Sequence, residues 1–373
     1  MMMFFLFLIT ICVPLSQGFI STGTVCKDQN DCVSCVAHNG LQGENCRWCP
    51  RDSNCHASGS VAFKPCSRAE NIVNKNDCGS IVSANYDPAV AYKMVFLSAL
   101  AYADNITTYI PEATEVKTFR LVRQVTKPCS GYAKCSGYTA MSHVEKAIVV
   151  AFRGTDNPKQ LIDECRRMLT EPKVSFQAGG KVQGYFYEVF LLIWQDLKSE
   201  VYQLISQHPS YKIWVTGHSL GGAMASLAST LIAYNGKTTK NNSILYTFGQ
   251  PRVGNYDYAS IHDKLVPISF RVTHYRDPVV HLPPCKKTFL VPSCLKIGGG
   301  PYHHGNEIFY GSDIMIKSSS FKMCKGLPHN EDLDCSNNVK VWVQCFLPTD
   351  FFKCVNEHNI YFGISVGHGW EKH

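Results

Sequence analysis

A serine stands in the pentapeptide Gly217-His-Ser219-Leu-Gly221, between a strand-like apolar run and a stretch of small residues typical of a helix. A sharp turn from strand to helix lifts a serine hydroxyl out of the end of a sheet, and the flanking glycines let neighbouring backbone approach closely. The N-terminus of the following helix carries partial positive charge, which stabilises a developing oxyanion. The bare pattern occurs by chance in many proteins, but this context predicts that Ser219 is a nucleophile.

A nucleophilic serine needs a histidine as its general base and a carboxylate that orients the histidine. In α/β-hydrolases the three residues follow the order Ser, then Asp or Glu, then His. Asp277 follows a predicted strand, at the end of the sheet where ligands collect, so we predict that it is the acid, although an Asp before Pro is also a common turn former. The residues alone leave the base open, because seven histidines lie downstream: His281, His303, His304, His329, His358, His368 and His373.

Several motifs over residues 85–373 resemble the class 3, or fungal-type, lipase family. They are Phe152-Arg-Gly-Thr155, Val215-Thr-Gly-His-Ser219-Leu-Gly-Gly-Ala223, Tyr246-Thr-Phe-Gly-Gln-Pro-Arg-Val-Gly-Asn255, Asp277-Pro-Val-Val-His-Leu-Pro-Pro284, His303-x-Gly-x-Glu307 and Glu357-His358-Asn-Ile-Tyr-Phe-Gly363. The resemblance implies an α/β-hydrolase fold with a Ser219–Asp277–His358 triad. It also implies an oxyanion hole made by the backbone amides of Thr155 and Leu220, assisted by the Thr155 hydroxyl. No cofactor and no metal are expected.

The choice of base falls on His358 rather than His303. His303 comes just before a strand-like run, and in the family this histidine is structural; a hydrogen bond to the nearby Glu307 would hold it without chemistry. His358 lies in the polar stretch Asn356-Glu-His-Asn359, which we expect to be a loop from which the imidazole reaches the serine.

Lipases of this family carry a short amphipathic lid after the Arg-Gly-Thr segment. Here the corresponding stretch, 156–167, contains only Leu161 and Ile162 as large aliphatic residues. A lid with so little apolar surface predicts weak activation at a lipid–water interface.

The elements that must position these residues are strands alternating with helices, a pattern that predicts a mostly parallel sheet. Continuous apolar or β-branched runs predict strands, and apolar residues at helical spacing predict helices. The predicted strands are 146–152, 212–216, 243–248 and 267–272, and the predicted helices are 88–103, one from 186 to near Pro209, and 223–234.

Eight of the eighteen cysteines lie between Cys26 and Cys78, in a stretch too poor in aliphatic residues to fold without cross-links. Residues 19–80 resemble the plexin–semaphorin–integrin (PSI) module, which implies a small structural or interaction module with an unknown protein partner. The spacing of Cys32, Cys35, Cys46 and Cys49 also fits a zinc site, but the even count in a secreted chain favours disulfides.

Residues 1–18 read as a secretory signal peptide, because the apolar run is too short to span a bilayer and small residues follow it. No later segment reaches transmembrane length, so we expect a secreted, extracellular protein. Sequons at Asn105 and Asn241 fit glycosylation there. The net charge of +7 comes from scattered residues and does not indicate nucleic-acid binding.

Loss of a signal peptide that contains Cys12 leaves seventeen of the eighteen cysteines, an odd number. Short sequence separation favours the pairs Cys129–Cys135, Cys285–Cys294, Cys324–Cys335 and Cys345–Cys354. We therefore expect Cys165, in the lid segment, to be a free thiol.

Together these features predict a secreted serine hydrolase that cleaves the carboxylic esters of lipids, similar to a triacylglycerol lipase. A phospholipase or a feruloyl-type esterase on the same scaffold remains open, because acyl specificity depends on the shape of lid and pocket. A catalytically silent binding protein is disfavoured, since such a protein has no physical need for all three triad groups.

Overall fold

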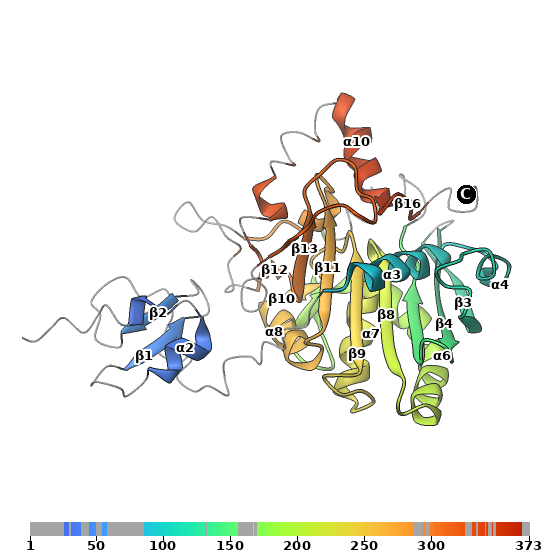
Figure 1. Ribbon diagram of the computed structural model, residues 1–373, viewed down its shortest axis with the longest axis horizontal. Coiled ribbons are helices and arrows are strands. Elements are labelled where there is room, and N and C mark those ends of the chain that lie inside the picture. The colour runs from blue at the N-terminus through green and yellow to red at the C-terminus, as the bar shows by residue number, and fades with distance from the viewer. Residues whose placement is uncertain are drawn as a thin grey trace, which may run out of the picture. The chain divides into compact units, whose positions relative to one another are not determined.

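In the computed structural model, the chain forms two compact units, Met1–Cys78 and Gly79–His373 (Figure 1). The structure describes residues 26–29, 31–38, 45–49, 54–57, 86–130, 133–155, 167, 170–286, 294, 299–324, 330–332, 335–339, 341, 345 and 348–367. The signal peptide 1–18, the lid residues Leu161 and Ile162, and the thiol expected at Cys165 lie outside these residues. Within the described residues, no helix is both long and apolar enough to cross a membrane.

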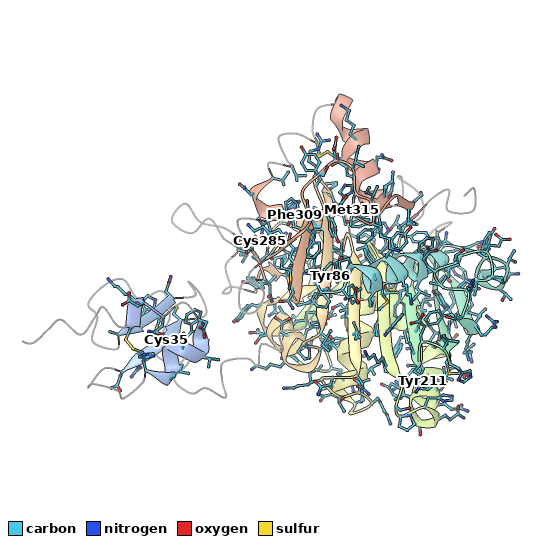
Figure 2. All side chains as sticks on the ribbon, viewed as in Figure 1. Cys35, Tyr86, Tyr211, Cys285, Phe309 and Met315 are labelled. Carbon is cyan, nitrogen blue, oxygen red and sulfur yellow. A yellow bond between two sulfur atoms is a disulfide. The ribbon has the colours of Figure 1, made fainter. Side chains whose placement is uncertain are left out.

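The small unit contains the helix α2 (Cys32–Ala37) and the antiparallel strands β1 (Cys46–Cys49) and β2 (Asn54–Ala57). The disulfide Cys35–Cys55 joins α2 to β2, with Cys35 labelled in Figure 2, and the disulfide Cys26–Cys46 joins the segment before α2 to β1. Trp48 is buried in the same cluster. Cys32 and Cys49 are also disulfide-bonded. All four cysteines of the alternative zinc site are therefore oxidised, and the disulfide interpretation of this region is confirmed.

The large unit is built on an eight-stranded sheet with the order β14-β13-β11-β9-β8-β5-β4-β3. The five strands from β13 to β5 are parallel to one another, and antiparallel strands complete both edges. This confirms the mostly parallel sheet of an α/β-hydrolase. The bounds are β3 Arg120–Ser130, β4 Ala133–Ser142, β5 Ala147–Phe152, β8 Lys212–His218, β9 Ser243–Phe248, β11 Ser269–His274, β13 Asn306–Tyr310 and β14 Lys322–Met323.

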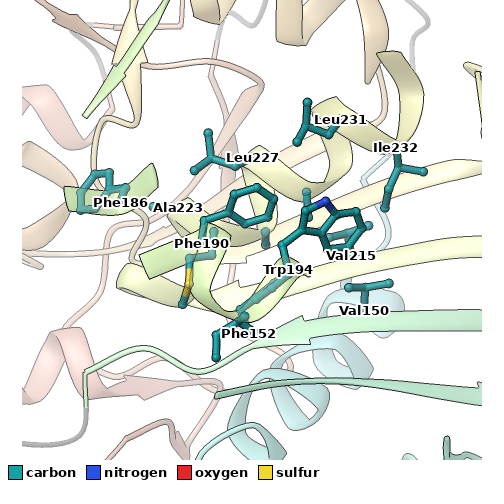
Figure 3. Packing of buried hydrophobic residues seen from close by; sticks show 14 of the residues in the cluster. Val150, Phe152, Phe186, Phe190, Trp194, Val215, Ala223, Leu227, Leu231 and Ile232 are labelled. Carbon is teal, nitrogen blue, oxygen red and sulfur yellow. The ribbon is translucent and has the colours of Figure 1, made fainter. Parts of the chain in front are cut away.

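Helices cover both faces of the sheet, which explains the continuous apolar runs of its central strands. In β5, Ile148, Val150 and Phe152 pack with the helices α6 (Gly184–Gln207) and α7 (Leu220–Tyr234). Figure 3 shows Val150 and Phe152 beside residues of these helices. The alternate residues Ala147, Val149 and Ala151 belong to the core beneath α3 (Pro88–Leu100). Pro88 in the first turn and the Asp87 side chain, which accepts from the Ala89 amide, fix the start of α3.

Smaller elements fill the connections. A four-stranded sheet has the order β12-β10-β7-β6, and the last helix, α10, leads into a two-stranded hairpin. The bounds are α4 Ile106–Tyr109, β6 Lys173–Ser175, β7 Lys181–Gln183, β10 Gly254–Asn255, α8 Tyr256–Leu265, η3 Val279–His281, β12 Pro301–Tyr302, η4 Ser336–Asn338, α10 Pro348–Asn359, β15 Ile360–Tyr361 and β16 Ile364–Ser365.

Four disulfides of the large unit join cysteines that are close in sequence. They are Cys129–Cys135, Cys285–Cys294, Cys324–Cys335 and Cys345–Cys354, so all four predicted pairs are confirmed. The last two cross-link the segment that leads from β13 into α10.

Candidate active site

Ser219 lies at the turn between β8 and α7, with φ 58° and ψ −127°. A side chain rarely adopts this backbone conformation, and residues held in it cluster at active sites. Close packing imposes the turn: a β-carbon on Gly217 would lie 2.2 Å from the Gly221 carbonyl oxygen, and one on Gly221 would lie 2.2 Å from that of Phe152. The two glycines of the pentapeptide therefore let the turn that carries Ser219 pack against β5.

Asp277 lies in the turn after β11 and is fully buried. Its carboxylate accepts hydrogen bonds from the Val279 amide at 2.8 Å and the Tyr361 hydroxyl at 2.7 Å. Burial by itself raises the pKa of Asp277, but attraction to His358 and the hydrogen bonds from His358, Tyr361 and Val279 outweigh it and lower the pKa to about 2. The carboxylate is thus ionised at neutral pH.

His358 joins the serine to the acid. Its Nε2 lies 2.9 Å from Ser219 Oγ, and its Nδ1 lies 2.9 Å from each carboxylate oxygen of Asp277. The structure thus brings together the three residues singled out from the sequence. The expected loop position of His358 is wrong: the residue lies in the last turn of α10, which a bidentate pair between Arg276 and Glu357 fastens to the turn after β11.

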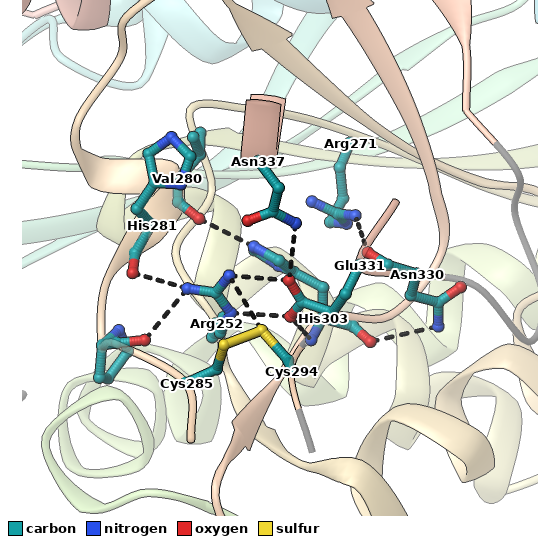
Figure 4. Close-up of a disulfide and its surroundings, with 11 residues drawn as sticks. Arg252, Arg271, Val280, His281, Cys285, Cys294, His303, Asn330, Glu331 and Asn337 are labelled. Carbon is teal, nitrogen blue, oxygen red and sulfur yellow. Dashed lines mark hydrogen bonds and ion pairs between the residues drawn. A yellow bond between two sulfur atoms is a disulfide. The ribbon is translucent and has the colours of Figure 1, made fainter. Parts of the chain in front are cut away.

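His303, the rejected base, is buried elsewhere in the fold (Figure 4). Its Nε2 lies 2.8 Å from the Val280 carbonyl oxygen, and its backbone amide donates to Glu331. The expected hydrogen bond with Glu307 is wrong, because the Glu307 carboxylate instead accepts from Thr273 and the Ser336 amide. Among the described residues, no contact joins His303 to Ser219 or Asp277.

The two residues expected at the oxyanion hole, Thr155 and Leu220, both lie near the serine. Leu220 is the first residue of α7, and the leading amides of a helix have no acceptor within the helix. Thr155 is buried and follows Gly154, where a β-carbon would lie 2.4 Å from the His218 carbonyl oxygen and 3.1 Å from Ser219 Cβ. The loop after β5 therefore passes close to Ser219.

Comparison with known proteins identifies the family. Residues 149–287 match the lipase (class 3) family. A lipase of Caenorhabditis elegans is 35% identical over 295 residues, which cover 76% of this chain and 81% of the worm protein. The chain belongs to the class 3 lipase family. A lipase of Rhizopus niveus is 27% identical over 81% of this chain and 71% of its own length.

Solved structures of fungal lipases share the fold of this class 3 lipase. A lipase from Rhizopus microsporus var. chinensis superposes with a TM-score of 0.59 at 26% identity, covering 76% of this chain and 88% of that one. A triacylglycerol lipase whose catalytic centre is described as a serine protease triad superposes with a TM-score of 0.58 at 29% identity, covering 74% and 95%. The expected activity is confirmed: the class 3 lipase is a carboxylic ester hydrolase.

Two further features of the site in this class 3 lipase escaped the sequence analysis. Gly249, after β9, has φ 58°, and a β-carbon there would lie 2.8 Å from Asp277 Oδ2 and 2.9 Å from His358 Nδ1. His218, inside the pentapeptide, lies 2.8 Å from the Tyr102 hydroxyl through Nδ1 and 2.8 Å from the His358 carbonyl oxygen through Nε2. Both residues belong to the family motifs, but only their contacts with residues distant in the sequence indicate a role in the site.

Proposed function

We propose that Ser219, Asp277 and His358 are the catalytic triad of a lipase that hydrolyses lipid esters through an acyl-enzyme. The observation that carries this proposal is the continuous chain of hydrogen bonds from the strained Ser219, through both nitrogens of His358, to the buried Asp277. A serine, a base in contact with it and an acid in contact with the base are the three parts that acyl transfer requires.

In this mechanism, Ser219 Oγ attacks the ester carbonyl carbon while His358 Nε2 takes its proton. The carboxylate of Asp277 holds the Nδ1–H of the imidazole and stabilises the imidazolium that forms. The oxyanion of the tetrahedral intermediate accepts hydrogen bonds from the amides of Thr155 and Leu220. His358 then donates its proton to the leaving alcohol. In the second half of the reaction, His358 takes a proton from a water molecule, which attacks the acyl carbon. His358 returns this proton to Ser219 Oγ as the carboxylic acid leaves.

The substrate we propose is a triacylglycerol-like lipid at a lipid–water interface. The names of the relatives support this choice, since one similar solved structure is a triacylglycerol lipase and a Penicillium camembertii relative is a secreted mono- and diacylglycerol lipase. We further propose that residues 1–18 are a signal peptide, that 19–80 form an interaction module for another protein, and that 85–373 form the catalytic domain of an extracellular enzyme.

A hydrolysis panel tests the function. Triacylglycerol, phosphatidylcholine, a feruloyl ester and a short p-nitrophenyl ester are supplied to the wild type and to Ser219→Ala, each below and above the concentration at which lipids aggregate. We expect hydrolysis of triacylglycerol by the wild type alone. Preference for phosphatidylcholine or the feruloyl ester would replace the proposed substrate, and activity retained by Ser219→Ala would overturn the triad.

A further inference from the structure

Two successive backbone carbonyl groups at the end of α10 are each held by a buried histidine ring. His274 Nδ1 lies 2.9 Å from the carbonyl oxygen of Glu357, and His218 Nε2 lies 2.8 Å from that of His358. His218 is the last residue of the strand that leads into Ser219, and His274 ends the strand that precedes Asp277. The backbone that carries the proposed base is thus hydrogen-bonded to both strands that carry its partners.

The two histidines differ in what lies at their second nitrogen. A carbonyl oxygen can only accept a hydrogen bond, so His218 must carry its proton on Nε2, and its Nδ1 then accepts from the Tyr102 hydroxyl. Burial, followed by repulsion from His358, lowers the pKa of His218 to about 3. His218 is therefore a neutral imidazole whose contacts are all satisfied.

His274 has a carbonyl oxygen at each nitrogen. Its second nitrogen, Nε2, lies 3.0 Å from the carbonyl oxygen of Ser312, in the loop after β13. A neutral imidazole has one N–H and one lone pair, so it can satisfy only one of the two carbonyls and would direct its lone pair at the other. Both contacts are hydrogen bonds only when the ring carries two protons.

We propose that His274 is a buried imidazolium and a positioning residue for His358, which it holds through the carbonyl group of Glu357. This inference rests on the proposed role of His358 as the base. When His274 loses a proton, either Glu357 or Ser312 loses its donor and faces a lone pair instead. The last turn of α10 then loosens, and the Nε2 of His358 is held less well against Ser219.

The charged and titratable groups around His274 are compatible with a cation. The side chain of Glu357 pairs with the guanidinium of Arg276, and the Asp277 carboxylate lies three residues further along the chain than His274. The ring of Tyr361 lies 5.8 Å from that of His274, between ring centroids, and burial raises the pKa of Tyr361 so that it stays neutral. Two further titratable groups nearby are Tyr310, the register partner of His274 on β13, and Asp313, the exposed residue next to Ser312.

Nitrogen-15 NMR of the wild-type protein, labelled at histidine, tests the protonation state directly. Both ring nitrogens of His274 should give imidazolium signals at neutral pH. The matched control is His262, which is also buried but faces two hydroxyl groups, Thr230 Oγ1 at 2.8 Å and Ser269 Oγ at 3.1 Å. A hydroxyl can donate or accept, so His262 should give the signals of a neutral ring. Neutral signals from His274 at pH 7 would overturn the proposal, whatever the catalytic result.

Kinetics test the positioning role. His274→Asn removes the charge and one of the two links, so kcat on a soluble ester should fall about tenfold or more, with KM little changed. The wild-type kcat should also fall reversibly as the pH rises through the range in which NMR shows His274 losing its proton, and this fall should be absent from His274→Asn. His262→Asn should keep the wild-type kcat and pH profile. An unchanged kcat in folded His274→Asn would refute the positioning role, whereas activity in Ser219→Ala would refute the proposed triad and leave the NMR result standing.

Discussion

The hydroxyl of Tyr361 donates a 2.7 Å hydrogen bond to Oδ2 of Asp277, and both residues are fully buried. Tyr361 follows His358 by three residues, at the start of the hairpin β15–β16, so one short segment supplies both a base and a donor to the acid. Burial and then repulsion from the carboxylate raise the pKa of Tyr361, so the phenol keeps its proton and continues to donate.

Replacement of Tyr361 by Phe tests this contact. We expect kcat to fall about tenfold, because a hydrogen bond to a charged group contributes on the order of 1.5–3 kcal/mol while Asp277 keeps its other donors. Tyr211→Phe is the matched control, since within the described part of the chain its hydroxyl contacts the ring of His143, away from the site. Equal kcat values for the two variants, per folded molecule, would argue against a role for Tyr361.

His358→Ala and His303→Ala should fail in different ways. Loss of His358 should lower kcat by on the order of 10⁴ or more while the protein stays folded. Loss of His303 should lower the free energy of unfolding by about 1–3 kcal/mol, because the buried Val280 carbonyl loses its donor, but should spare the turnover of folded enzyme. Turnover and thermal unfolding measured on both variants decide the assignment; a near-normal kcat for His358→Ala would contradict it.

Gly249→Ala should damage catalysis by steric conflict. The new methyl group would lie within 2.9 Å of both Asp277 and His358, and a displacement of about 1 Å can reduce kcat on the order of 10²-fold. Gly236→Ala is a close control: Gly236 also has a positive φ, 65°, but nothing lies within 4 Å of the added carbon. Both variants should lose stability through backbone strain, and only Gly249→Ala should lose turnover. Equal turnover in the two would show that the acid–base pair tolerates the methyl group.

The stability contributed by Asp277 should disappear in acid. Its pKa is about 2 in the folded protein against an ordinary value of 3.8, so the folded state binds fewer protons than the unfolded state between these values. This contribution, on the order of 2 kcal/mol, is complete above about pH 4 and is lost as the pH falls toward 2. Chemical unfolding of wild type and Asp277→Asn across this range should show the wild type losing stability relative to the variant. A constant difference would mean that the acid is not ionised in this way.

Sequence patterns predicted the central strands of the sheet well. They failed for segments whose composition is mixed or rich in glycine. The run at 146–152 is apolar on both faces of β5, so its pattern is strong. The hairpin β3–β4 was not predicted, because an antiparallel edge with one exposed face mixes Arg, Gln and Thr with its apolar residues. The start of α7 was placed at Ala223 instead of Leu220, because Gly221 and Gly222 are weak helix formers.

The site residues were predictable only where a local sequence motif marks them. Ser219 and Asp277 stand next to recognisable strands, so local pattern and chain order identified them. The helical position of His358 was missed because α10 mixes polar and apolar residues within a cysteine-bearing excursion. The contacts of His274 and Tyr361 join residues 83 and 84 positions apart, and no local pattern reports such pairs.

The strained backbone conformation of Ser219 lowers the stability of the folded protein at the residue proposed for catalysis. Glycine is at ease with a φ of 58°, whereas a side chain there is disfavoured by about 1–3 kcal/mol. An inactive descendant of this enzyme would therefore become more stable by exchanging the proposed nucleophile for glycine. Selection for turnover alone would keep the serine in place, so the residue proposed to perform the chemistry is also one that the rest of the fold must hold against its own conformational preference.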